Sequence, residues 1–136
     1  HRFKQAQNAV LFAAGSCWEG VDFPGDMVSS LIIVRLPFPV PDPLSEAERE
    51  QYPTLQDYIK AVVIPDMQVK LRQGFGRAIR TETDTCVVSI LDHRAAPGER
   101  YHKAVLETLP PIRITSKIED VEDFIRAKKG PDYFMP

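Results

Sequence analysis

Short apolar runs alternate with helical repeats along this chain of 136 residues. Runs at 9–14, 30–35 and 85–91 predict buried strands, and a shorter strand is expected at 112–115. Helical periodicity predicts helices at about 45–51, from 54 through 62, from 65 to 80, at 99–109 and from 116 to 128. This alternation is typical of an α/β fold: a mostly parallel sheet flanked by helices, with its chemistry at the carboxyl ends of the strands. The continuous run at 85–91 is expected to be covered on both faces.

Several residues are expected to mark the ends of these helices. Thr54 suits an N-cap, and Pro65 suits the first turn of the next helix because proline has no backbone donor to lose there. Ser116 and Glu119 have the spacing of a capping box for the last helix, which Gly130 is expected to end. The chain is interpreted as a single domain, 1–136, with a Pro-rich and helical insertion at about 37–64.

One face of the helix expected at 65–80 is the first candidate site. At about 100° per residue, Arg77 and Arg80 lie within roughly 40° of Gln73. The opposite side is apolar and consists of Met67, Leu71, Phe75, Ala78 and Ile79. Two guanidiniums and an amide that project together suit phosphate, because the charge of arginine is permanent and its planar fork matches a pair of phosphoryl oxygens.

An ordinary surface helix would show the same division into polar and apolar sides. Gly74 and Gly76 argue against that alternative, because each costs about 1 kcal/mol relative to alanine inside a helix. Glycine at these positions suggests that a ligand or another backbone comes close to the arginines, or that the helix is irregular there.

The second candidate site is the glycine- and acid-rich segment 15–26. Gly15 and Gly20 have the spacing of a phosphate-binding P-loop, but Val21 and Asp22 follow them in place of lysine and serine or threonine, so this is not a Walker A loop. Trp18 would equally suit a core position under the loop. Among the acids, Asp26 suits a turn, whereas Asp22 lies between apolar neighbours and is expected to be functional or partnered.

The order of these segments carries a family resemblance over roughly residues 9–110. Segment 15–26 (GSCWEGVDFPGD), followed by 32–39 (IIVRLPFP), resembles helicase motif V and its following strand in the DinG/XPD-like branch of superfamily 2. Segment 73–80 (QGFGRAIR), followed by 86–94 (CVVSILDHR), resembles motif VI of the same branch. The resemblance implies the C-terminal, RecA-like lobe of an ATP-dependent DNA helicase, a fold of the P-loop NTPase type, here expected to be truncated at its N-terminus.

The resemblance also implies roles for individual residues. Arg77 and Arg80 would act as arginine fingers on the γ-phosphoryl group, and Gln73 would position the nucleotide or the attacking water. The residues that would bind ATP or couple its cleft to the DNA track are Glu19, Gly20, Asp22 and Gly76. Those that would contact single-stranded DNA are Gly15, Ser16 and Trp18.

The first lobe, which these residues do not include, would hold most of the ATP and Mg²⁺, and an iron–sulfur cluster would belong only there. The expected partners are that first lobe and single-stranded DNA, in DNA repair or replication, with no membrane. A net charge of −2 does not suggest a general nucleic-acid binder, so a local patch such as Arg35, Lys70 and Arg72 would have to bind DNA.

Cysteine and histidine give no sign of a metal site. Cys17 and Cys86 are too few for a disulfide framework, and the three histidines lack metal-ligand spacing with them. A reduced protein is therefore expected, in the bacterial or archaeal cytoplasm or, in a eukaryote, the nucleus.

A rival interpretation is a non-catalytic α/β module that binds a partner protein or a phosphorylated ligand through the same arginines. A third keeps the helicase-like lobe but couples it to a nuclease, although no nuclease-type cluster of acids is visible in the sequence. A Walker A lobe upstream of His1 in the gene would favour the motor, and its absence would favour the module. Because the 136 residues contain neither a Walker A nor a Walker B motif, we predict that this chain alone neither hydrolyses ATP nor unwinds DNA. DNA-stimulated hydrolysis by the pure chain would contradict this prediction.

Overall fold

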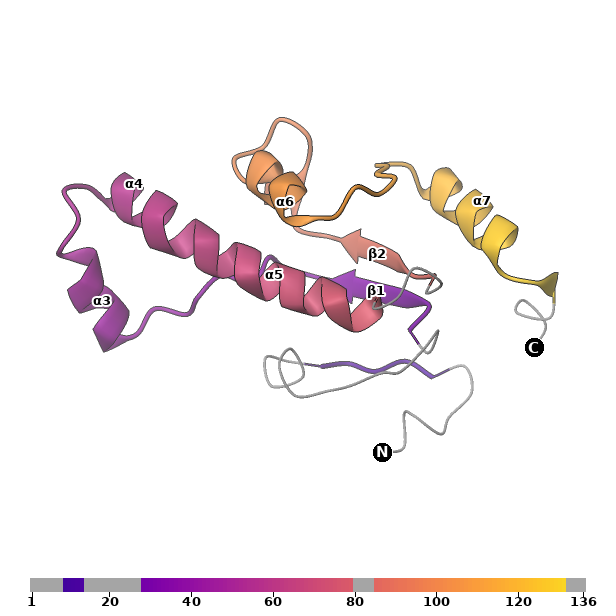
Figure 1. The fold of residues 1–136 in the computed structure, drawn as a ribbon, viewed down its shortest axis with the longest axis horizontal. Coiled ribbons are helices and arrows are strands. Elements are labelled where there is room, and N and C mark those ends of the chain that lie inside the picture. The colour runs from indigo at the N-terminus through magenta and orange to yellow at the C-terminus, as the bar shows by residue number, and fades with distance from the viewer. Residues whose placement is uncertain (1–8, 14–27, 80–84, 132–136) are drawn as a thin grey trace.

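The computed structural model describes residues 9–13, 28–79 and 85–131, and its centre is a parallel pair of strands (Figure 1). Strand β1 (Ser30–Ile33) pairs with β2 (Val87–Ile90), with Ser30 opposite Val87 and Ile33 opposite Ile90. The strands expected at 30–35 and 85–91 are therefore present in shorter form, and their parallel pairing is confirmed. Parallel neighbours need a long crossover connection, and the helices between them supply it.

That crossover holds α3 (Pro43–Arg49), α4 (Leu55–Tyr58), the π-helix η1 (Ile59–Val63) and α5 (Ile64–Ala78). After β2 come the 3₁₀-helix η2 (His93–Ala95), α6 (His102–Thr108) and α7 (Ile118–Lys128). Figure 1 shows α5 lying along the sheet, while α3 and α4 lie beyond its carboxyl end and α7 stands apart from the other helices. The α/β class is as expected. That 37–64 is an insertion remains a prediction.

An apolar cluster joins the sheet, α5 and α6. Its buried members are Ile33, Leu36, Met67, Leu71, Tyr101 and Val105, and Met67 and Leu71 are fully buried. Leu31, Val88 and Ile90 pack against the same cluster, so one face of the sheet is covered. The run 85–91 is not fully covered on both faces as expected, because Val87 to Ile90 are only half-buried and Leu91 is 63% exposed.

A break was expected before Pro65, but the chain is helical without interruption from Leu55 to Ala78. The π-helix makes this continuity possible, since the N–H of Ile64 donates to the carbonyl of Ile59, five residues earlier. Pro65 then falls in the first turn of α5, as predicted, although here a helix precedes it. Thr54 caps α4 as expected, its hydroxyl accepting from the N–H of Asp57 at 3.2 Å.

Two helices begin differently from the prediction. Helix α3 begins at Pro43 because Asp42 and Ser45 form a capping box, each side chain accepting from the other's backbone N–H at 2.8 Å. The capping box expected from Ser116 and Glu119 is absent. Lys117 is the N-cap of α7 and makes no side-chain cap, and its own N–H donates to the hydroxyl of Thr115.

Helix α7 ends at Lys128 as expected, and Gly130 follows directly after its C-cap Lys129, although this glycine does not adopt a positive φ. Two strand expectations are wrong for the described residues. Residues 9–13 and 112–115 form no strand. In the second of these segments Ile112 and Ile114 are 41% and 57% exposed, so the alternation of apolar residues there does not mark a buried face.

Within 9–13, 28–79 and 85–131, no helix combines the length and apolarity that a membrane span requires.

Leu71→Ala should lower the free energy of unfolding by about 2–5 kcal/mol, because Leu71 is fully buried between α5 and the sheet and alanine would leave a cavity. Urea unfolding of the chain measures this. The matched control is Leu106→Ala on α6, where leucine is 38% exposed and the loss should be clearly smaller. Equal losses in the two variants would contradict the assignment of the core.

Candidate functional site

Helix α5 presents two of the predicted site residues as expected. Gln73 is exposed and Arg77 is half-buried, while the side chains opposite them are buried. The buried set is Met67, Leu71, Phe75 and Ala78. The apolar side of the predicted helix is therefore confirmed, and it holds Gln73 and Arg77 at the surface.

The helix expected from 65 to 80 ends earlier in the structure, which corrects the expected bounds. Helix α5 ends at Ala78, and Ile79 is extended with φ −131° and ψ 118°. The reason is topological: the chain must leave the helix and reach the start of β2 at Val87 within nine residues. Of the predicted face, the structure describes Gln73 and Arg77. Arg80 lies outside the described residues, and its place on that face stays a prediction.

The two glycines of α5 have different surroundings. Gly74 is buried within the helix. Gly76 is exposed, and a Cβ built there would meet no atom within 4 Å. Glycine at 76 is therefore not required by packing inside this lobe, and its side of the helix is open to an approaching group, beside Arg77.

Both candidate motifs lead into the same end of the sheet. Segment 15–26 precedes β1 and segment 73–80 precedes β2. The two strands are hydrogen-bonded where they begin, the N–H of Val87 donating to the carbonyl of Ser29 at 3.0 Å. This is the amino end of the two strands, whereas the sequence placed the chemistry at the carboxyl ends. The loop residues predicted for the site lie outside the described residues: Gly15, Ser16, Trp18, Glu19, Gly20 and Asp22.

At the carboxyl end of the sheet the structure builds a brace around Asp92, which is 7% exposed. Its carboxylate accepts from the backbone N–H of Leu36 at 2.9 Å and from that of Arg94 at 3.1 Å. The guanidinium of Arg94 donates to it twice, at 2.9 Å and 2.6 Å, and lies 4.9 Å from the ring centroid of Phe38. The brace therefore joins the chain after β1 to the chain after β2.

The electrostatics of this brace explain how a carboxylate is buried. Hydrogen bonds from the Arg94 side chain hold the pKa of Asp92 well below its usual range, against the opposing effect of burial, and backbone N–H groups add to the lowering. The same contact raises the pKa of Arg94. Because the charge of Arg94 is already paired, we assign the pair a structural role.

The sequence shows Asp92 and Arg94 at the end of an expected strand, but the brace was not predicted from it. The signal that could have indicated it was an acid directly after an apolar run, followed two residues later by arginine. The brace borders a depression of about 360 Å³ that is lined by Val34, Arg35, Leu91, Asp92, His93 and Arg94. Among the described residues, no group of three His, Cys, Asp or Glu side chains is placed to hold a metal ion.

Comparison with known proteins agrees with this α/β lobe and its paired motifs. Residues 1–112 match the family described as the helicase C-terminal domain, and the chain belongs to that family.

Three relatives are bacterial proteins. The chain is 40% identical over 126 residues to the ATP-dependent DNA helicase YoaA of Escherichia coli, covering 91% of this chain and 20% of the relative. It is 39% identical over 112 residues to the ATP-dependent DNA helicase DinG of Photobacterium profundum, covering 81% and 16%. It is 34% identical over 130 residues to the 3'-5' exonuclease DinG of Bacillus subtilis, covering 93% and 14%. The chain thus spans a fifth or less of the length of these three relatives.

Asp92→Asn should lower the free energy of unfolding at pH 7 by about 1–3 kcal/mol, because the brace loses its charge while keeping its shape. The low pKa of Asp92 in the folded chain gives the pH dependence. The contribution of the ionised Asp92 to the free energy of unfolding is fully present above the ordinary carboxyl pKa of about 4. It is lost as the pH falls from there through the lower pKa of the folded chain. Urea unfolding from pH 7 down to pH 3 should therefore show the difference between the wild-type chain and the Asp92→Asn variant narrowing. A difference that is constant with pH would contradict the ionised brace.

Proposed function

We propose that this chain is the second motor lobe of a DNA helicase that hydrolyses ATP, of the type that includes DinG and YoaA. The observation that carries the proposal is the hydrogen-bonded meeting of the chain after each motif-like segment, at Ser29 and Val87. Two segments that are far apart in the sequence thereby lead into one end of one sheet. Membership of the helicase C-terminal family supports the same assignment.

In this proposal Arg77 and Arg80 reach a nucleotide that the first lobe holds. The first lobe, together with the Mg²⁺ ion that accompanies ATP, would hold the β- and γ-phosphates. The guanidiniums stabilise the negative charge that develops on the γ-phosphoryl oxygens as the bond to the leaving oxygen breaks. Gln73, one turn before Arg77, has an amide that both donates and accepts, and it orients the attacking water or the nucleotide.

The apolar side of α5 is what makes these groups useful as fingers. A charge that acts on a transition state must be held in place before the reaction, so that little reorganisation is needed. The side chains of Met67 and Leu71 are fully buried on the inner side of α5 and anchor this helix to the sheet. A Cβ at the exposed Gly76 would meet no atom within 4 Å, which leaves room for the first lobe and its nucleotide to approach beside Arg77.

The segment before β1 supplies the second half of the proposal. Ser16 and the loop amide of Gly15 would contact DNA phosphates, and Trp18 would stack on a base. Glu19, Gly20 and Asp22 would transmit closure of the nucleotide cleft to this DNA track, together with Gly76. Single-stranded DNA and the first lobe are therefore the partners that we propose.

Arg77→Ala in the full-length protein should lower DNA-stimulated ATP turnover by about 10³-fold while nucleotide affinity changes only a few-fold, because a finger acts mainly in the transition state. Steady-state hydrolysis and equilibrium binding of a fluorescent nucleotide measure the two effects. The matched control is Arg49→Ala, an exposed arginine on α3, which should leave both unchanged.

Normal turnover by both the Arg77→Ala and the Arg80→Ala variants would contradict the motor assignment. The non-catalytic module would instead be established if the wild-type protein turned over no ATP and the two variants lost binding of a phosphorylated ligand or a protein partner.

A further inference from the structure

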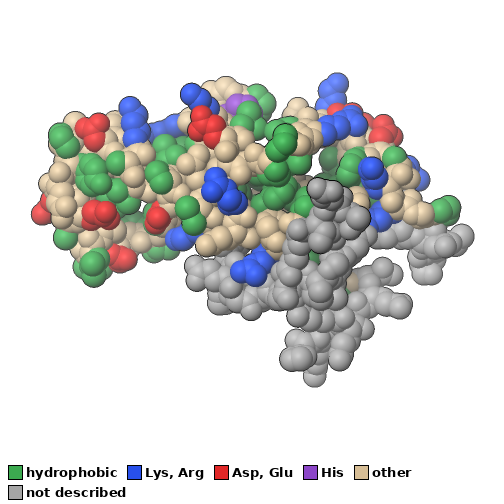
Figure 2. Space-filling view, in the orientation of Figure 1, with side chains coloured by type: hydrophobic (Ala, Val, Ile, Leu, Met, Phe, Trp, Pro, Cys, Tyr) green, Lys and Arg blue, Asp and Glu red, His purple; other side chains and the backbone are tan. Residues whose placement is uncertain are grey.

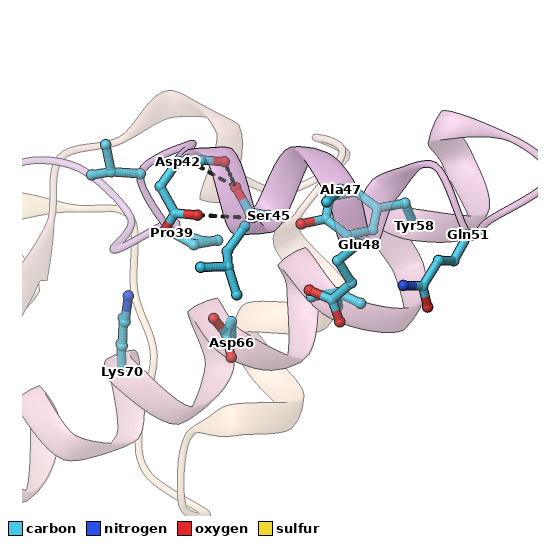
Figure 3. A pocket seen from close by; sticks show the side chains of 12 residues that line it. Pro39, Asp42, Ser45, Ala47, Glu48, Gln51, Tyr58, Asp66 and Lys70 are labelled. Carbon is cyan, nitrogen blue, oxygen red and sulfur yellow. Dashed lines mark hydrogen bonds between the residues drawn. The ribbon is translucent and has the colours of Figure 1, made fainter.

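A groove of about 730 Å³ lies between α3 and the continuous helix formed by α4, η1 and α5, away from the candidate motor site (Figure 3). One wall is α3 with the preceding passage 39–42, and the other is α4, η1 and the first turns of α5. The lining residues that matter for its chemistry are Val40, Asp42, Leu44, Glu48, Asp66 and Lys70.

The groove is acidic. Segment 42–66 contains six acidic and two basic residues, a net charge of −4, whereas the whole chain carries −2. Asp42 and Glu48 line one wall and Asp66 the other, where Lys70 is the one basic residue of the lining, so three acids face one base. Figure 3 shows the carboxylates of Glu48 and Asp66 on facing helices. The pKa of Tyr58 is raised first by burial and then by the negative charges of Glu48, Asp42 and Asp66, which places its phenol in their common field.

The same groove exposes aliphatic side chains. Val40 is 82% exposed and Leu44 is 84% exposed, although both line it. Figure 2 shows acidic and apolar side chains gathered at this end of the molecule. Aliphatic contact surface beside an excess of carboxylates suits a site that receives an amphipathic protein segment.

The negative charge of the groove argues against nucleic acid as its occupant. A phosphate backbone would be repelled by Asp42, Glu48 and Asp66, because nucleic-acid affinity depends on neutralising phosphates with basic side chains. A segment rich in lysine and arginine would instead be attracted, and its encounter would be accelerated.

The position of the groove argues against the first lobe as its occupant. The passage into α3 leaves the carboxyl end of β1, whereas the candidate motor segments enter the amino ends of both strands. Figure 1 shows α3 at the far end of the molecule from the start of β1 and β2. A first lobe that meets Arg77 therefore leaves this groove uncovered, a step that depends on the proposed function.

We propose that this groove docks a basic amphipathic segment of another protein. Lysine or arginine side chains of the segment pair with Glu48 and Asp66, whose carboxylates make no hydrogen bond or ion pair within the described structure. Aliphatic side chains of the segment pack on Val40 and Leu44. The capping box between Asp42 and Ser45 fixes the start of α3 and so holds this wall in place.

The test uses the full-length protein and a fluorescent helical peptide of about 12 residues, built from leucine and lysine so that one face is apolar and the other basic. Anisotropy gives its Kd, and a photoreactive group on the peptide maps its contact. The double variant Glu48→Lys, Asp66→Lys should weaken binding by about 10-fold or more, because two attractions become repulsions. Leu44→Ser should also weaken binding, with its salt dependence preserved.

The matched control is Glu99→Lys, Asp123→Lys, which makes the same change in net charge at two exposed positions outside the groove and should leave the Kd within a few-fold. Equal weakening in the groove and control variants, crosslinks outside residues 39–70, or oligothymidylate that crosslinks in this groove would each overturn the proposal. DNA-stimulated ATP turnover separates it from the motor assignment. The groove variants should keep turnover, and Arg77→Ala should lose turnover while keeping peptide binding.

Discussion

Met67 and Leu71 hold α5 against the sheet, and the rest of the lobe depends on that contact. Both side chains are fully buried in a cluster that also includes Ile33 and Val105. Burying such side chains stabilises the fold by roughly 1.5–3 kcal/mol each, and few other elements contribute to this small core. With this side of α5 fixed, Gln73 and Arg77 must face outward, so the same packing that stabilises the lobe orients its candidate chemistry.

Two contacts then set the ends of the sheet. The bond between Val87 and Ser29 brings together the chain that follows each motif-like segment, and the Asp92 brace closes the opposite end. The brace uses a buried charge that is fully hydrogen-bonded, which avoids the cost of an unpaired one. The proposed motor chemistry and the docking groove thereby lie at opposite ends of one lobe, and each is accessible to a different partner.

Much of this fold could be predicted from the sequence because local patterns coincide with packing. The apolar spacing of α5, the cap at Thr54 and the two apolar strands all appear as expected. The prediction was wrong where the outcome depended on residues far away or on backbone register. The π-helix before Pro65, the early end of α5 before Arg80 and the absence of a strand at 112–115 are such cases. The Asp92 brace was missed because its partner Leu36 lies 56 residues away.

Arginines of this lobe are proposed to act on a nucleotide that another lobe holds. An experimental structure of the full-length protein with single-stranded DNA, Mg²⁺, ADP and a fluoroaluminate that mimics the transferred phosphoryl group would test this directly. We expect the guanidinium of Arg77 or Arg80 to lie within hydrogen-bonding distance, about 3 Å, of the fluoroaluminate, with the side of Gly76 facing the first lobe. Both guanidiniums directed away from a fully occupied nucleotide site would contradict the proposal.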